Sequence, residues 1–379
     1  MSKKLLVFVL AVAVGFTFFG CAKVAETTQS GGGGGNPTTL PAGTTAVRLA
    51  ASNIQCSGNN MTLSMSALNQ NNNVVSGLTT GNFTGGIYSS NPSISSVTAA
   101  TTLSAVATIT FTAISGGGGS GVASRDVSAA LVIDKSGSMW TDKLVSAEIA
   151  GKMFVDQMAT GPNNNCAVVL FDDHVSVEAS MRNAAANKQS LIDAVTTEAA
   201  YGGSTALYYA IANGIWEASK EAASATRVRA VVALTDGGEN ASPYPYSGTS
   251  TGTIELVNQA VAAGIPVYTV GLYMSSSEAS YYAPYLKSIA LGTTGSESNY
   301  FEVIVGVTGL SAQRARALGV LTDLYTQLFT GLSQSYSMTS QISSSLTAGQ
   351  TYWLLITFTA PVQGGSTITQ TLVIPFIAH

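Results

Sequence analysis

The chain changes its pattern of hydrophobic and polar positions twice along its 379 residues. Residues 44 to about 115 carry short apolar or alternating runs, such as MTLSMSAL and LSAVATITFTA, which Asn- and Gly-rich turns separate. Runs of this length and spacing predict β-strands, and no helical period interrupts them. We therefore expect an all-β domain over residues 44–122, built as a β-sandwich, with an immunoglobulin-like sandwich as one option, and ending in the Gly-rich linker SGGGGSG.

From Asp126 onward, apolar runs of strand length alternate with segments of helical period. VSAALVID, CAVVLFDD, VRAVVALTD and IPVYTVGLY predict buried strands, whereas residues 142–159 and 205–223 have helical spacing. VSVEAS follows CAVVLFDD across a short turn at Asp173-His174, which predicts an antiparallel edge pair. Repeated strand–helix units predict an α/β domain over residues 123–334, with a mostly parallel central sheet and helices on both faces.

The tail, residues 335–379, returns to a strand pattern. YWLLITFTA and ITQTLVIPF flank a turn at Val362-Gln363-Gly364-Gly365 and predict a hairpin. Because an isolated hairpin is marginally stable in water, we expect this one to pair with other strands. Pairing with residues 44–115 would complete the β domain and make the α/β domain an insertion within it. The alternative is that the hairpin packs against the α/β domain.

The N-terminus carries a processing signal. Lys3 and Lys4 precede the apolar run from Leu5 to Phe19, which predicts a secretory signal over residues 1–20 rather than a membrane span. Cys21 follows a small residue at the expected cleavage point, and FFGC resembles the lipobox of bacterial lipoproteins more than an ordinary signal peptide that contains a cysteine. This resemblance implies cleavage before Cys21, acylation of its sulfur, and sorting to an outer membrane if the cell has two membranes.

Residues 21–43 predict a flexible tether beyond the lipidated cysteine. This segment contains a run of five consecutive glycines and two prolines, a composition that cannot bury enough surface to fold. The lipid would hold the protein at a membrane surface without a spanning helix. The tether would then lift the folded part away from that surface.

Composition narrows the function classes. Charged residues make up 9% of the chain, against roughly a quarter in typical domains, and the net charge is −4. Without a basic stripe, nucleic-acid binding has no electrostatic support. Cys56 and Cys166 fall in different predicted domains, which favours two separate buried thiols over a disulfide. The chain has only two histidines and no CxxC motif, so a zinc site is disfavoured.

Carboxylate and hydroxyl groups gather where the predicted parallel strands end. Asp134, Ser136 and Ser138 end the first strand, Thr205 opens a helix after a glycine turn, and Asp236 ends a later strand. Ligands of open α/β sheets bind at the carboxyl ends of the strands. Oxygen donors without sulfur or imidazole suit Mg²⁺, Mn²⁺ or Ca²⁺, and few carboxylates with small hydroxyls favour Mg²⁺. The sequence therefore predicts a divalent-metal site.

Three pieces of sequence, DKSGSM, GGSTAL and LTDGGEN, occur in this order at the predicted strand ends. They resemble the metal-ion-dependent adhesion site of von Willebrand factor A (VWA) domains, and the resemblance covers Asp126 to about Leu332. It implies a Rossmann-like fold in which the serines and the threonine contact the metal directly and the aspartates often act through water. It also implies one open metal position, which an Asp or Glu carboxylate of a partner protein fills.

Four neighbours of the motif are candidate residues of the ligand rim: Lys135, Trp140, Glu239 and Asn240. For Lys135, a side chain that points to solvent is favoured over a role beside the metal. Trp140 fits an aromatic contact surface with Tyr244 to Tyr246 and fits equally well packing against the first helix. Glu239 and Asn240 are favoured as solvated loop residues.

The motifs and the signal together favour a binding module. The predicted protein is a surface-anchored lipoprotein whose metal bridges to an acidic residue of an extracellular or periplasmic protein. The alternative is a structural envelope or surface-assembly component that uses the α/β domain as a docking scaffold. A metal-dependent hydrolase is disfavoured, because the sequence has no GxSxG, HExxH or P-loop motif and places neither histidine as a general base. We therefore expect no enzymatic activity.

Overall fold

A computed structural model describes most of the chain from residue 36 onward. The described ranges are 36–71, 73–90, 105–116, 125–139, 142–197, 203–224, 226–294, 297–305, 329–330 and 332–378. The predicted signal peptide, Cys21, Trp140, the predicted strand SISSVTA and most of the predicted helix 312–332 lie outside these ranges. Within the described ranges, none of the helices has the length and apolar character needed to cross a membrane.

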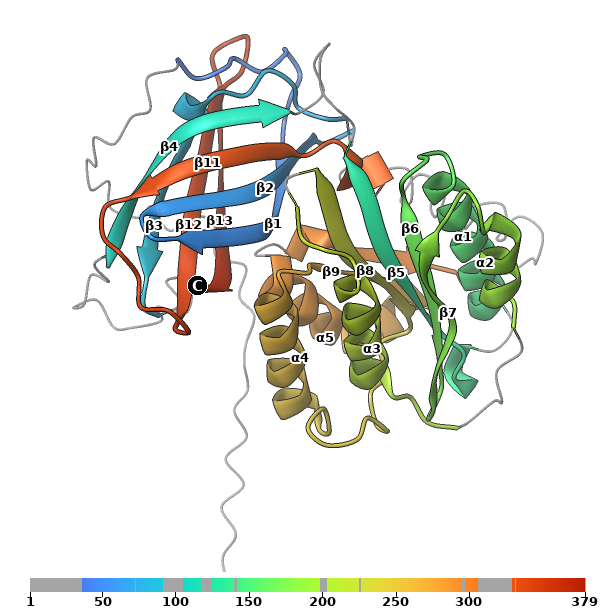
Figure 1. Cartoon of the computed structure of the whole chain (residues 1–379). Helices are drawn as coiled ribbons and strands as arrows, with labels where there is room; N and C mark the ends of the chain where they lie inside the picture. The colour runs from blue at the N-terminus through green and yellow to red at the C-terminus, as the bar shows by residue number, and fades with distance from the viewer. Residues whose placement is uncertain are drawn as a thin grey trace, which may run out of the picture. The chain divides into compact units, whose positions relative to one another are not determined.

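The α/β part is built on a six-stranded sheet in the order β10-β9-β8-β5-β6-β7 (Figure 1). All neighbours are parallel except β6 and β7, which form the expected antiparallel edge pair. The strands are β5 (Asp126–Asp134), β6 (Asn165–Phe171), β7 (Val175–Asn183), β8 (Arg227–Thr235), β9 (Val267–Tyr273) and β10 (Tyr300–Ile304). The predicted mostly parallel sheet is therefore present.

Helices cover both faces of this sheet, as the alternating pattern predicts. They are α1 (Asp142–Met158), α2 (Lys188–Val195), α3 (Leu207–Ser219), α4 (Thr249–Ala263) and α5 (Ser276–Thr294). One hydrophobic core joins α1 and α2 to one face, and a second joins α3, α4 and α5 to the other (Figure 1). The central strand β5 is buried on both faces, which explains its continuous apolar run.

The remaining described strands form one seven-stranded antiparallel sheet in the order β1-β2-β11-β4-β3-β12-β13. They are β1 (Val47–Ser57), β2 (Asn60–Asn69), β3 (Phe83–Tyr88), β4 (Ala107–Gly116), β11 (Tyr336–Ile342), β12 (Thr351–Pro361) and β13 (Thr367–Ile377). The edge strands β1 and β13 also contact each other, so the sheet curls around a single core. The expected immunoglobulin-like sandwich of two sheets is not found. Periodicity gives the buried face of each strand but not which strands pair.

The tail is part of this β sheet. β12 and β13 form the expected hairpin, β12 pairs with β3, and β11 lies between β2 and β4 (Figure 1). The α/β part is thus inserted between β4 and β11 of the β domain. The end of the predicted tether is also packed there, because Leu40 is 1% exposed and its N–H donates to the Pro361 carbonyl at 2.8 Å.

The two cysteines of the described residues are free and buried. Cys56 lies in the β-domain core and Cys166 in the core under α1, so they are the separate thiols that the sequence favours. Burial raises the pKa of each thiol to about 12. Because the thiolate is the reactive form, both are inert at neutral pH.

Replacing Met338 tests whether the tail contributes to the β-domain core. Met338 of β11 is fully buried, and Met338→Ala should lower the free energy of unfolding by about 2–5 kcal/mol. The control is Gln341→Ala, since Gln341 is exposed on the same strand and should cost little. Urea unfolding followed by fluorescence measures both variants. Equal stability of Met338→Ala and the wild type would contradict the tail's place in this core.

Candidate metal centre

The first carboxylate of the site is the last residue of β5. Asp134 is fully buried, and both of its oxygens accept hydrogen bonds. The Ser136 N–H donates to Oδ1 at 2.8 Å, and the Thr235 hydroxyl donates to Oδ2 at 2.6 Å. Thr235 ends β8, which pairs in parallel with β5. The strand pairing itself therefore fixes the orientation of the Asp134 carboxylate.

The two serines of the motif lie on a tight 3₁₀ turn after β5. Their Oγ atoms are 3.2 Å apart, so both hydroxyls reach the same place. Ser136 is 1% exposed, whereas Ser138 is exposed at the surface. Met139 is fully buried and its N–H donates to the Ser136 carbonyl at 3.0 Å, which anchors the turn in the core.

Thr205 and Asp236 both lie close to Gly238. A Cβ atom built on Gly238 would lie 3.7 Å from Thr205 Oγ1 and 3.9 Å from Asp236 Oδ1. Gly237, directly after Asp236, has a φ of 90°, a conformation that glycine adopts without strain. The glycine pair of LTDGGEN thus lets the chain turn directly after Asp236 and puts no side chain between Gly238 and the oxygens of Thr205 and Asp236, which are 4% and 2% exposed.

The carboxylates of Asp134 and Asp236 repel each other. Burial, and then the negative charge of Asp236, raise the pKa of Asp134 to about 7. Two buried carboxylates close enough to repel each other are stabilised by a cation between them. The site residues therefore supply carboxylate and hydroxyl oxygens, and the two carboxylates repel each other. This set of donors fits a hard divalent ion such as Mg²⁺ or Mn²⁺.

Lys143 is a functional neighbour that sequence reasoning missed. Its side chain is 4% exposed, and its Nζ lies 2.8 Å from Asp236 Oδ2 and 2.7 Å from Glu278 Oε1. Burial lowers the pKa of Lys143, but hydrogen bonds to the two carboxylates outweigh it and raise that pKa above its usual value. The signal in the sequence is a lysine in the first turn of the helix that follows DKSGSM.

Lys135, a candidate residue of the ligand rim, has different surroundings from those that the sequence favoured. Lys135 does not point to solvent: it is 2% exposed and forms an ion pair with Glu148 of α1 at 2.6 Å. A buried lysine needs a partner carboxylate, and Glu148, thirteen positions further along the chain, supplies one. Trp140 lies outside the described residues, so its two interpretations stay predictions.

Glu239 and Asn240 hold the loop after Asp236 against the start of α3. The Glu239 carboxylate accepts hydrogen bonds from the Tyr208 N–H at 2.9 Å and from the Ser242 hydroxyl at 2.7 Å. Asn240 Oδ1 accepts from the Thr205 N–H at 2.7 Å. These two side chains are therefore not merely solvated. They position Thr205, and a carboxylate at a helix N-terminus also complements the helix dipole.

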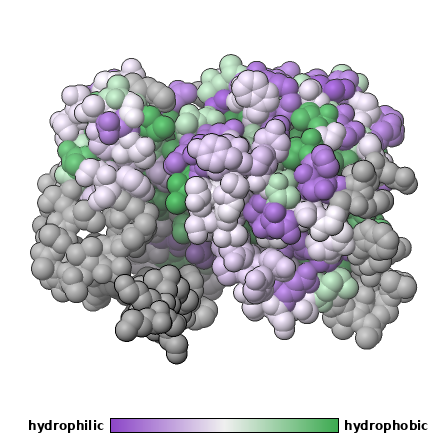
Figure 2. Space-filling view, turned by 90° about the horizontal axis from the view of Figure 1, so that it is seen from below, coloured by the Kyte–Doolittle hydropathy of each residue, from purple (hydrophilic) through white to green (hydrophobic). Residues whose placement is uncertain are grey.

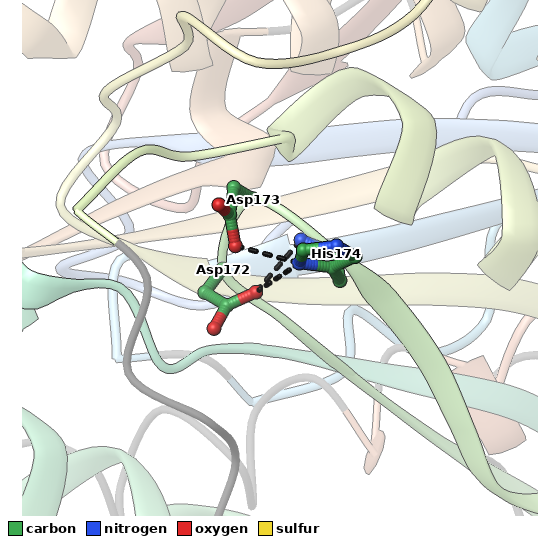
Figure 3. A group of neighbouring side chains, drawn as sticks. All are labelled: Asp172, Asp173 and His174. Carbon is green, nitrogen blue, oxygen red and sulfur yellow. Dashed lines mark hydrogen bonds and ion pairs between the residues drawn. The ribbon is translucent and has the colours of Figure 1, made fainter.

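Three neighbouring side chains at the end of β6 form a separate acidic group (Figure 3). His174 Nδ1 lies 2.8 Å from Asp173 Oδ1 and 3.8 Å from Asp172 Oδ1, and His174 is 88% exposed. Asp172 is 4% exposed, and its carbonyl accepts the Ala206 N–H at 2.6 Å. This backbone bond ties the turn to the residue after Thr205, so the group helps to locate the start of α3.

Comparison with known proteins finds a family model that matches most of the α/β part. The family model described as von Willebrand factor type A domain matches residues 130–304. This range contains the motif residues Asp134, Ser136, Ser138, Thr205 and Asp236. No curated protein sequence matches the chain.

Several solved structures are similar to the chain. The vWF domain of the type V pili tip protein Mfa5 from Porphyromonas gingivalis is 12% identical, with a TM-score of 0.40, and the match covers 55% of this chain and 97% of that one. The PilB minor pilin from Streptococcus sanguinis is 13% identical, with a TM-score of 0.42 and coverages of 76% and 79%. BatB from Bacteroides thetaiotaomicron is 18% identical, with a TM-score of 0.36 and coverages of 53% and 98%.

The raised pKa of Asp134 predicts how metal-free stability depends on pH. The pKa of the Asp134 carboxyl is about 7 in the folded protein and about 3.9 in the unfolded chain. Between these values the folded state holds a proton that the unfolded state has released. The free energy of unfolding in chelator should therefore fall as the pH rises from about 4 to about 7, by at most about 1.4 kcal/mol per pH unit.

Asp134→Asn should remove this part of the pH dependence. Urea unfolding in chelator at pH 5, 6, 7 and 8 compares the two proteins, and Asp193→Asn is the control because Asp193 is exposed, lies outside the motif and is bonded by the non-titrating Gln189 amide. Parallel pH profiles of Asp134→Asn and the wild type would show that Asp134 does not titrate in this range.

Proposed function

Residues 130–304 form a von Willebrand factor type A domain, and from this we propose that the chain is a surface-anchored binding protein that captures a partner through a divalent metal. The metal is Mg²⁺, or Mn²⁺ or Ca²⁺ in its place. The partner is an extracellular or periplasmic protein that offers an Asp or Glu carboxylate. The chain itself carries out adhesion or surface assembly rather than catalysis.

One observation carries this proposal. The five motif residues supply hydroxyl oxygens and two buried carboxylates, and burial together with the negative charge of Asp236 raises the pKa of Asp134 to about 7. Ser136, Ser138 and Thr205 would hold the metal directly, and Asp134 and Asp236 would balance its charge. Such an ion, when bound with one position open, supplies a strong contact for an incoming carboxylate.

Tyrosines flank the site and supply a contact surface for the partner. Tyr244 is 88% exposed and Tyr281 is 67% exposed. Tyr209, at the start of α3, lies against Tyr246 with ring centroids 6.1 Å apart. Tyr282, next to Tyr281, approaches a Cβ built on Gly237 within 2.9 Å, which places this pair beside Asp236. Tyrosine offers large contact area with few rotatable bonds, so it suits a binding surface.

The face of the molecule seen from below is mixed in polarity. Seen from below, the coloured residues form a mosaic of purple and white with small green patches (Figure 2). A surface of this kind suits a reversible contact more than a permanent one, because obligate interfaces are more hydrophobic. This favours metal-dependent capture over the second candidate, a permanent docking scaffold in an envelope or surface assembly.

The sequence signal supports attachment to a membrane. Cleavage before Cys21 and acylation of its sulfur would anchor the chain at an outer membrane or cell surface. The glycine run of the tether would then give the binding site reach from that surface.

Metal binding by the soluble protein, starting at Ala22, is the first experiment. Calorimetry with Mg²⁺ and Mn²⁺ should give saturable binding of one ion per chain. Asp134→Ala should abolish it, because the variant removes a carboxylate that balances the metal charge. The control, Asp193→Ala, removes an exposed carboxylate on α2 outside the motif and should leave binding unchanged.

Two results would oppose the proposal. Equal affinity of the wild type and Asp134→Ala would place the ion elsewhere. Absence of binding in the wild type would remove the metal from the function and favour the metal-free docking scaffold.

Replacing Cys21 tests the anchor. Cys21→Ser should release the protein from the membrane fraction of a bacterium that carries lipoprotein-processing enzymes, because serine offers no thiol for acylation. Cys56→Ser is the control, since Cys56 is a buried core thiol. Fractionation and immunoblotting measure both, and a membrane-bound Cys21→Ser protein would contradict lipid anchoring through this residue.

A further inference from the structure

We propose that Lys143 is a built-in counter-ion of the metal site, which competes with the bound ion for Asp236 and so sets the metal affinity. The lysine stabilises the site when no metal is bound and weakens the hold on the metal when it is. The part of this inference that concerns metal affinity rests on the proposed function. The part that concerns the metal-free protein does not.

The two oxygens of the Asp236 carboxylate have different neighbours. Oδ2 accepts a hydrogen bond from Lys143 Nζ at 2.8 Å. Oδ1 faces the site, since it lies 3.9 Å from a Cβ built on Gly238, and that same point is 3.7 Å from Thr205 Oγ1. One carboxylate thus serves both the ammonium and the place where a metal would bind.

Lys143 is held in this position from two sides. It belongs to the first turn of α1, and its second partner is Glu278 of α5 at 2.7 Å. Glu278 is fixed in turn, because its Oε2 accepts the Met274 N–H at 2.6 Å and its own N–H donates to Ser275 Oγ at 3.2 Å. The ammonium therefore lies between two fixed carboxylates, at 4% exposure, and has little freedom to leave.

The positive charge of Lys143 explains its effect on metal affinity. Asp134, Asp236 and Glu278 place three carboxylates in this region, and Lys143 is the cation that contacts two of them. The neighbouring Lys135 is already paired with Glu148. Where water is excluded, an ammonium this close to a divalent ion repels it strongly. Lys143 therefore lowers metal affinity and removes part of the carboxylate repulsion in the metal-free state.

A lysine with a purely structural role would behave differently. Its loss would destabilise the protein equally with and without metal, and would leave the affinity for metal unchanged. The counter-ion role predicts opposite effects on affinity from the two ends of the network, because Glu278 draws the ammonium away from Asp236.

Calorimetry with Mn²⁺ on the full mature chain tests these opposite effects. Lys143→Met should tighten binding by at least about tenfold, because it removes the repelling charge and frees Asp236. Glu278→Gln should weaken binding, because Lys143 is then left with Asp236 alone. Lys188→Met is the control, since Lys188 is half exposed and paired with Asp156 at 2.8 Å, away from the motif. Unchanged affinity in both Lys143→Met and Glu278→Gln would overturn the competition.

A double-mutant cycle in chelator tests the counter-ion role without any metal. Lys143→Met should lower Tm, because Asp236 loses its partner and stays buried. Adding Asp236→Asn should recover part of that loss, since the orphaned charge is gone. Additive losses would show that the two residues are not coupled and would overturn the proposal. If Lys143→Met does not fold, Glu278→Gln decides, because its weaker metal binding is then required.

The two experiments separate the inference from the proposed function. If no variant binds Mn²⁺ but the cycle shows coupling, the metal function fails and the counter-ion role of Lys143 stands. If the wild type binds Mn²⁺ and loses it with Asp134→Ala, while the Lys143 and Glu278 variants match the control, the function stands and the competition fails.

Discussion

The site depends on two carboxylates that the parallel pairing of β5 and β8 brings to the same edge of the sheet. Asp134 ends β5, and Asp236 follows the last residue of β8. Both are buried, and the loss of hydration, followed by the negative charge of Asp236, raises the pKa of Asp134. The sheet tolerates this arrangement because hydrogen bonds from Ser136 and Thr235 hold one carboxylate and Lys143 holds the other. A divalent ion would relieve the same repulsion more completely.

The described loops around the site hold its oxygens in place through hydrogen bonds. The loop after Asp236 turns away at two glycines and then fastens onto α3 through Glu239 and Asn240. The turn after β6 fastens onto the same helix start through the Asp172 carbonyl. Backbone hydrogen bonds therefore hold Thr205 from both sides, which keeps its hydroxyl close to Asp236.

Much of this could be predicted from sequence because it follows from local pattern. The alternation after Asp126 predicted the parallel sheet, and strand ends predicted where the oxygens gather. The tail hairpin also followed, and of its two expected partners, the N-terminal strands and the α/β domain, the structure pairs it with the N-terminal strand β3. What the sequence did not reveal depends on long-range contacts. The β strands form one curled sheet instead of a sandwich, and β11 enters between β2 and β4. Lys135 and Lys143 are both buried because glutamates of distant helical positions meet them. No periodicity encodes such pairs.

The most direct test of the metal site is a crystal structure of the soluble protein grown with Mn²⁺, measured for anomalous scattering. The assignment predicts a single strong anomalous peak bounded by the hydroxyls of Ser136, Ser138 and Thr205. Absence of a peak there at saturating Mn²⁺, with Lys143 still paired to Asp236, would contradict it. The domain would then be a metal-free scaffold in which the lysine alone balances the buried carboxylates.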